Sequence, residues 1–196
     1  MLDRIDSNVA ALDSELGWRM SGAAISGARV PTFKDFPSDG KGPQWFTETF
    51  LVASILDSFG LADTRSGDWT PESMLRGRLA VATQAMNRPL GDAEQKALRA
   101  MSENGSAGAV ATDGFVWTVM IRRGSGAVVT RHDLRPYYVE ALERRRFRDA
   151  VERDRRGAMR FVSVMGRIAG ESHPREHGQT DPGMNRQHRL TNRWEL

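Results

Sequence analysis

The period of the hydrophobic pattern changes between about residues 114 and 133. Two β-rich segments, GFVWTVMIRR and AVVTRHDL, lie on either side of Gly124-Ser125-Gly126. Branched and aromatic runs around a short glycine turn are typical of a β-hairpin. The other periodic segments repeat their apolar residues at helical spacing. The sequence therefore predicts a mainly α fold with one β-hairpin, at about 114–133.

Amphipathic helices are expected on both sides of this hairpin. The segment after Thr70 has the clearest start signal, because Thr70 can cap a helix and Pro71 at its first position loses no hydrogen bond. The expected helices span about 3–18, 44–60, 71–87, 93–102, 137–156 and 158–169. Those from residue 44 onward, together with the hairpin, are expected to form one helical core domain over 44–170.

Two arms are expected to flank this core. Residues 20–44 are rich in Gly, Ser and Pro, so residues 1–43 are expected to form a short helix on an extended connector. Such a segment can dock on another subunit or fold back on its own core. Residues 171–196 contain few core-forming side chains, and we expect an arm there that orders on a partner.

Charge is distributed unevenly along the chain. Residues 1–120 have a net charge of −4, whereas residues 121–196 have a net charge of +7 with 17 arginines and no lysine. The planar guanidinium matches phosphate geometry better than an ammonium does. Such an asymmetry between the two parts of a chain indicates nucleic-acid contact. The competing interpretation is a solvated helix face of mixed charge.

Several classes of protein are not expected. The chain has no cysteine, which excludes disulfides and thiol catalysis, and it has no run of 18 apolar residues to span a membrane. The first residues carry acids early and lack the layout of a secretory signal. Arg122-Arg123-Gly124-Ser125-Gly126 lacks the lysine of a phosphate-binding loop. We expect no metal site or cofactor, because Pro174 separates His173 from His177 and prevents helical pairing.

The basic helix at 137–156 is the strongest chemical signal. Its candidate phosphate-binding residues are Arg144, Arg145 and Arg148, and Arg155 follows near its end. Acidic residues interleave with these arginines at the spacing of helical ion pairs, so the arginines can be free or internally paired. Neighbouring aromatics, including Tyr137 and Trp117, can stack on bases or fill the core.

A series of short motifs runs from Leu79 to Arg148. The chain reads AVATQAMNRPLGDAEQKALRAMSENG, then DGFVWTVM, a turn, AVVTRHDLRPYYVEAL and FRDAV. The residues that stand out in these motifs are Asp92, Glu94, Gln95, Glu103, Asn104, Gly105, Gly114, Trp117, Arg135, Pro136, Phe147 and Arg148. In this order the motifs resemble those of the coat proteins of flexible filamentous plant viruses of the potyvirus type. The spacing from Gly114 to Trp117 is longer here, and the family's Ala-Phe-Asp-Phe motif has no counterpart.

This resemblance implies a helical core with terminal arms that polymerise subunits around RNA. It also implies an RNA groove lined by the serine after Glu-Asn-Gly and by the arginine of Phe-Arg, which are Ser106 and Arg148 here. The expected function is therefore that of a coat subunit packaging single-stranded RNA in a helical filament, in a virion or the host cytoplasm, with no enzymatic activity.

Two other interpretations remain open. A small phage- or plasmid-encoded accessory protein that binds DNA or a protein partner needs the same basic helix without polymerising arms. A nuclease centred on His132 and Asp133 needs a base beside its orienting carboxylate. No second catalytic partner is set by spacing, so a structural or surface role for these two residues is the simpler interpretation.

Overall fold

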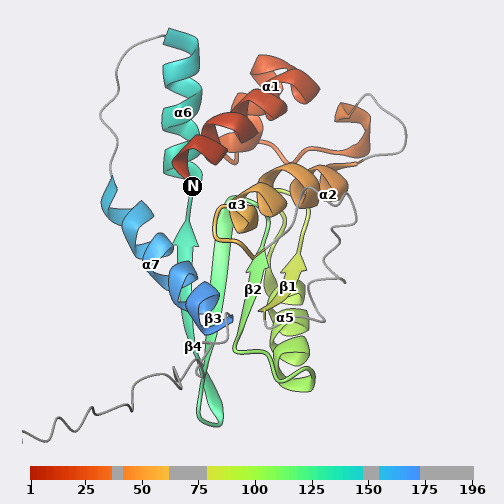
Figure 1. Ribbon diagram of the computed structural model, residues 1–196. Coiled ribbons are helices and arrows are strands. Elements are labelled where there is room, and N and C mark those ends of the chain that lie inside the picture. The colour runs from red at the N-terminus through yellow and green to blue at the C-terminus, as the bar shows by residue number, and fades with distance from the viewer. Residues whose placement is uncertain (37–41, 62–78, 148–154, 173–196) are drawn as a thin grey trace, which may run out of the picture.

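The computed structural model describes residues 1–36, 42–61, 79–147 and 155–172 (Figure 1). Its helical elements are α1 (Leu2–Ile25), η1 (Phe33–Asp35), α2 (Pro43–Phe46), η2 (Thr47–Val52), α3 (Ala53–Asp57), α5 (Gly91–Glu103), α6 (Arg135–Phe147) and α7 (Arg155–Ser172). Its strands are β1 (Leu79–Thr83), β2 (Gly108–Thr112), β3 (Val116–Arg123) and β4 (Gly126–Asp133). The predicted hairpin and the helices near 44–60, 93–102 and 158–169 are thereby confirmed.

The predicted fold class is wrong, because the hairpin is part of a four-stranded mixed sheet. The strand order is β1-β2-β3-β4, with β1 parallel to β2 and the other neighbours antiparallel. Helix α5 connects β1 to β2, as a parallel pair requires a crossover. β1 lies within the segment expected to be the 71–87 helix, whose first part is outside the described residues, and β2 was not predicted.

The two parallel strands share a tetrapeptide. Ala-Val-Ala-Thr occurs at 80–83 and again at 109–112, and the two copies pair in register, Val81 opposite Val110 and Thr83 opposite Thr112. Successive side chains of a strand point to opposite faces, so the valines share one face of the sheet and the alanines share the other. This alternation of size fixes which face each covering helix can approach.

Each face of the sheet is covered by different helices. α5 packs on β1 and β2 through small residues, and this alanine core contains Ala80, Ala82, Ala93, Ala97, Ala100, Met101, Ala109, Ala111 and Met120. The opposite face belongs to the main core, which includes side chains of α1, α3, α6 and α7. There, Phe161 of α7 lies edge-on to Trp117 of β3, with ring centroids 5.3 Å apart.

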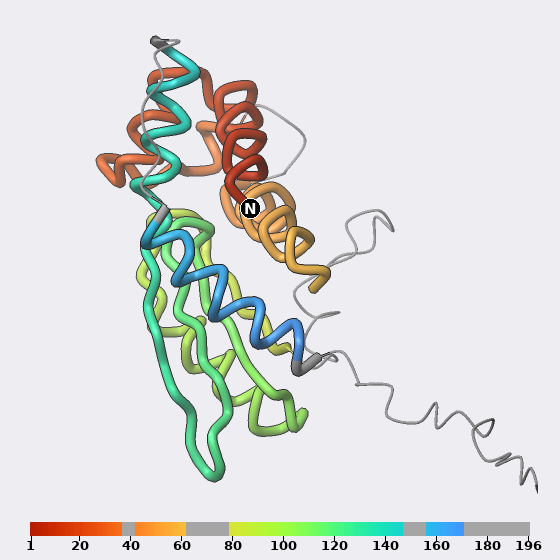
Figure 2. Tube along the Cα trace, turned by 60° about the vertical axis from the view of Figure 1, so that its left-hand side comes forward, coloured from red at the N-terminus to blue at the C-terminus, as the bar shows by residue number. Residues whose placement is uncertain are grey.

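The prediction of an extended N-terminal arm is also wrong. α1 continues to Ile25, and Val9, Leu12 and Ile25 are fully buried in the main core. α1 lies beside α6 above the sheet, as both ribbon and tube views show (Figures 1 and 2). Within this contact Asn8 Nδ2 donates to the Tyr138 hydroxyl at 3.0 Å. The N-terminal segment therefore folds back on its own core.

Candidate nucleic-acid interface

The candidate site begins at a break in α1. Gly17 has φ 70° and ψ 154°, a backbone conformation open essentially to glycine alone. A Cβ on Gly17 would meet no atom within 4 Å, so the constraint is on the backbone and not on space. The break separates the first part of α1 from a second helical piece that begins with Trp18. Trp18 is 60% exposed, an unusual position for the largest apolar side chain.

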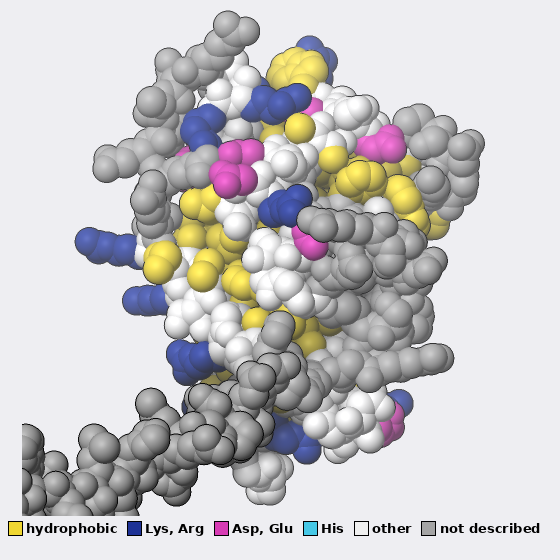
Figure 3. Space-filling view, in the orientation of Figure 1, with side chains coloured by type: hydrophobic (Ala, Val, Ile, Leu, Met, Phe, Trp, Pro, Cys, Tyr) yellow, Lys and Arg dark blue, Asp and Glu magenta, His cyan; other side chains and the backbone are white. Residues whose placement is uncertain are grey.

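Two arginines contact this exposed indole ring. The Arg19 guanidinium carbon lies 5.3 Å from the ring centroid, and that of Arg146 lies 5.2 Å from it. Arg146, in the last turn of α6, also donates a hydrogen bond to the Trp18 carbonyl oxygen. Figure 3 shows Lys and Arg side chains at the top of the molecule, beside a hydrophobic side chain that reaches the surface. The break in α1 and the end of α6 thus form one cationic, aromatic surface.

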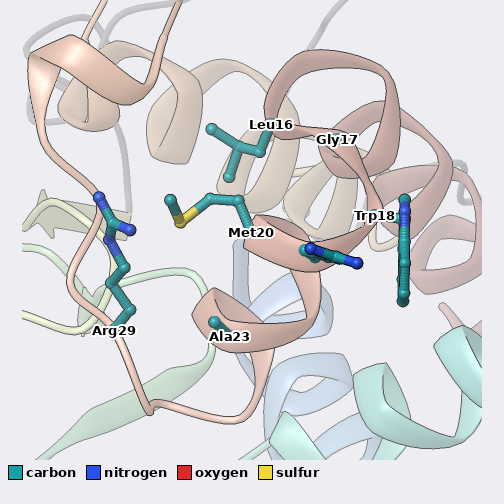
Figure 4. A pocket seen from close by; sticks show the side chains of 7 residues that line it. Leu16, Gly17, Trp18, Met20, Ala23 and Arg29 are labelled. Atoms are coloured by element: carbon teal, nitrogen blue, oxygen red, sulfur yellow. The ribbon is translucent and has the colours of Figure 1, made fainter.

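A pocket of about 330 Å³ opens beside this ring (Figure 4). Leu16, Met20 and Ala23 give it apolar walls, and the guanidinium groups of Arg19 and Arg29 belong to its lining. Its volume is at the small end of the range for small-molecule pockets. We name Trp18, Arg19, Arg29, Arg146 and this pocket the Trp18 site. It combines one flat aromatic ring, apolar walls and three cationic groups.

Arg29 is held in place by an ion pair. Its Nη2 lies 2.8 Å from Asp35 Oδ1. The backbone N–H and the hydroxyl of Thr32 both donate to Asp35 Oδ2, and these hydrogen bonds lower the pKa of Asp35. The carboxylate is therefore kept charged beside Arg29, which positions the guanidinium at the pocket.

Two of the predicted arginines are paired with acids of α1. Arg144 Nη2 lies 2.7 Å from Asp6 and its Nε lies 3.7 Å from Glu140, while Arg145 Nε lies 3.2 Å from Asp13. The sequence left open whether these arginines are free or internally paired. Both are internally paired, largely with acids of another helix. Their charge attaches α6 to α1, which leaves Arg146 as the residue of this run that turns toward Trp18.

The other predicted residues do not join the Trp18 site in the described structure. Ser106 is only 2% exposed; its N–H donates to the Met101 carbonyl and its own carbonyl accepts from Arg122 Nε at 3.1 Å. It therefore closes the turn between α5 and β2 inside the protein. Arg148 lies outside the described residues. Arg155 starts α7, and its side chain is likewise outside what the structure describes.

Gly114 and Arg135, which carried the family resemblance, and their neighbour Asp113 have structural roles here. Asp113 is buried and accepts hydrogen bonds from the N–H groups of Phe115, Val116 and Asn87, with Arg135 Nη2 at 3.4 Å. Burial raises the pKa of Asp113. A Cβ on Gly114 would lie 2.6 Å from a methyl carbon of Leu51, and Gly114 has φ 89°. These residues therefore stabilise the folded structure.

His132 and Asp133 have different hydrogen-bond partners in the described structure. They lie at a second pocket, of about 450 Å³, between the end of β4 and the start of α7. His132 Nε2 is 3.1 Å from the Thr130 hydroxyl, and its ring lies edge-on to Phe161. Asp133 Oδ1 instead accepts from the Arg135 N–H at 2.9 Å. Burial of the ring lowers the pKa of His132.

Sequence reasoning missed the Trp18 site because residues 3–18 fit one uninterrupted helix. The available signal was Gly17 followed by a tryptophan and an arginine at the end of that pattern. A glycine inside a helical pattern lowers confidence in its continuity. The contact with Arg146 joins positions 128 residues apart, which spacing along one helix does not reveal.

Comparison with known proteins yields no match to any protein-family model, curated protein or solved structure. No helix in the described part of the chain is long and apolar enough to cross a membrane. Across the same residues, no three His, Cys, Asp or Glu side chains gather as metal ligands would.

Proposed function

We propose that this protein binds single-stranded nucleic acid without reading its sequence, and that the Trp18 site makes the contact. The observation that supports the proposal is an exposed indole ring touched by two guanidinium groups beside an apolar pocket. Proteins that bind single strands combine cationic groups for the backbone with aromatic rings on which bases stack. Both components are present here within one surface.

Comparing magnitudes supports access of a base to the ring. An exposed cation–π contact contributes about 0.5–1 kcal/mol. Stacking of a base on an aromatic side chain contributes about 1–3 kcal/mol. A base can therefore replace one arginine over the indole of Trp18, and the displaced guanidinium becomes available to a neighbouring phosphate. Arg19 and Arg146 then act as phosphate ligands instead of ring partners.

Fluorescence anisotropy with labelled single-stranded RNA at low salt tests this proposal. Trp18→Ala is expected to weaken binding about tenfold, since about 1.4 kcal/mol corresponds to a factor of ten. Phe33→Ala is the matched control, because Phe33 is another exposed aromatic, at 66%. Equal affinity of Trp18→Ala and the unmodified chain, or equal losses in both variants, would contradict the proposal.

The salt dependence tests the phosphate contacts separately. Arg146→Gln is expected to weaken binding to all sequences alike and to reduce the slope of log K against log salt by about one. Arg99→Gln, an exposed arginine on α5, is the charge-matched control and should leave the slope unchanged. A change of slope with Arg99→Gln but not with Arg146→Gln would place the phosphate contact elsewhere.

The narrower form of the proposal is a coat subunit that packages RNA in a helical filament. The basic last third of the sequence and the order of motifs favour it, with residues 171–196 as the joining arm. An N-terminal joining arm is no longer part of it. Negative-stain microscopy and the A260/A280 ratio after nuclease treatment test it; discrete particles free of nucleic acid after RNA addition at low salt would refute it.

A further inference from the structure

Strand β4 forms an outer edge of the described sheet. It pairs with β3 alone, and none of its eight residues is buried. Val128 and Val129 are 49% and 55% exposed. The β3–β4 hairpin extends past the end of α5 in both views (Figures 1 and 2). An apolar, regular edge with unpaired backbone groups is a template for another strand.

Among the described residues, the first five residues of β4 lack the usual protections of an edge strand. Its register with β3 is unbroken from Val116–Asp133 to Arg123–Gly126, so it contains no bulge. It has no proline and no lysine, and its charged residues, Arg131 and Asp133, follow the uncharged stretch from Gly126 to Thr130. Natural sheets blunt their edges with these devices, so their absence here points to an edge that is used.

The direction of the free backbone groups follows from one hydrogen bond. The Leu134 N–H donates to the Phe115 carbonyl at 2.8 Å, which makes this the hydrogen-bonded type of opposed pair. Such pairs alternate along an antiparallel ladder. The even-numbered residues of β4 therefore bond toward β3. Ala127, Val129 and Arg131 point their N–H and C=O groups outward.

We infer that β4 pairs antiparallel with β4 of a second copy of this chain, about a two-fold axis at Val129. In this register Val129 faces the same residue of the second copy, and Ala127 faces Arg131. The two Arg131 side chains then attach about 14 Å apart, at about 3.4 Å per residue, which exceeds the screening length of about 8 Å. The result is one continuous sheet across two subunits.

The registers shifted toward the charged end of β4 are less favourable. Centring the pair on Arg131 sets two guanidinium groups directly opposite each other, and like charges in that position destabilise a sheet. Centring it on Thr130 places each Val129 opposite an arginine. Of these three registers, only the one centred on Val129 places Val129 opposite an apolar residue. It is also isologous, so it closes after two subunits, unlike the joining of subunits by arms. It does not depend on nucleic-acid binding.

Cysteine cross-linking tests this register, because the chain contains no cysteine. In a hydrogen-bonded pair the Cα atoms lie about 5.5 Å apart, within the range of about 4.4–6.8 Å that a disulfide spans. Val129→Cys is expected to give a disulfide-linked dimer under mild oxidation without nucleic acid. Ala127→Cys is the control; it places the two cysteines about 14 Å apart and should remain monomeric.

Sedimentation of the cysteine-free chain gives an independent readout. The unmodified protein is expected to show a concentration-dependent dimer. Val129→Glu, which sets two carboxylates opposite each other, should raise the dimer Kd at least about tenfold. Val128→Glu, whose side chain points to the other face, should raise it less. A monomer at every concentration, a cross-link at Ala127 in place of Val129, or equal effects of both glutamates would overturn the inference.

Discussion

The two faces of the sheet are packed with side chains of very different size. On one face the main core contains large aromatic side chains, including Trp117, Phe161 and Tyr138, between the strands and the helices. On the other face the alanines of β1 and β2 meet the alanines of α5. Close packing at native density requires large side chains where elements are far apart and small ones where backbones approach. Side-chain volume thus sets how closely each helix lies on the sheet.

The largest effect is expected from emptying the aromatic face, the face of the sheet that packs Trp117 and Phe161. Phe161→Ala removes a fully buried ring that contacts Trp117, His132 and Phe59. We expect the free energy of unfolding to fall by about 3–5 kcal/mol in urea denaturation. Met159→Ala, an exposed position on the same helix, should change it by less than about 0.5 kcal/mol. Similar losses for both would show that α7 does not cover this face.

A smaller effect is expected from enlarging a side chain on the alanine face. Ala109→Leu inserts extra carbon atoms between β2 and α5, and we expect a loss of about 1–3 kcal/mol from overpacking. Ala28→Leu makes the same change at an exposed residue and should be nearly neutral. If Ala109→Leu were as stable as the unmodified chain, α5 would have room to move away, and the contrast between the faces would fail.

The smallest expected effect is a pH dependence at the rim of the aromatic face. Burial lowers the pKa of His132 from its ordinary 6.5, so just below pH 6.5 the unfolded chain binds more protons than the folded one. The free energy of unfolding should therefore fall as the pH drops from 7 to 5. His132→Gln should reduce this fall, while the other three histidines contribute equally to both proteins. Parallel pH profiles would contradict the assignment.

The sequence was informative where the pattern was local. The turn at Gly124-Ser125-Gly126 and the periodicity of α5 and α7 predicted these elements correctly, because hairpins and amphipathic helices are encoded by neighbouring residues. β1 was mistaken for helix because the start signal at Thr70-Pro71 was taken to open a helix that continued through it to residue 87. The repeated Ala-Val-Ala-Thr was the missed signal, since two identical alternating tetrapeptides suit adjacent parallel strands.

The candidate site was harder to predict than the fold. Arg144 and Arg145 carry the charge that drew attention to α6, but their partners are Asp6 and Asp13, more than 130 residues earlier. Charge along one helix gives no information about such pairs. Trp18 belongs to a site because the break at Gly17 lies beside the end of α6 in the folded protein, which the sequence does not reveal. Site prediction therefore failed at long-range contacts.

The packing of α1 against α6 has a consequence for how the chain folds during synthesis. Gly17 breaks α1 into pieces of no more than about 15 residues, and isolated helices that short are marginal in water. The helix that α1 contacts most, α6, begins only at Arg135. At about 5–20 residues per second, roughly ten seconds of translation separate the two helices. Contacts of such high sequence separation form slowly. The Trp18 site is thus completed late, so a truncated or half-made chain would lack it.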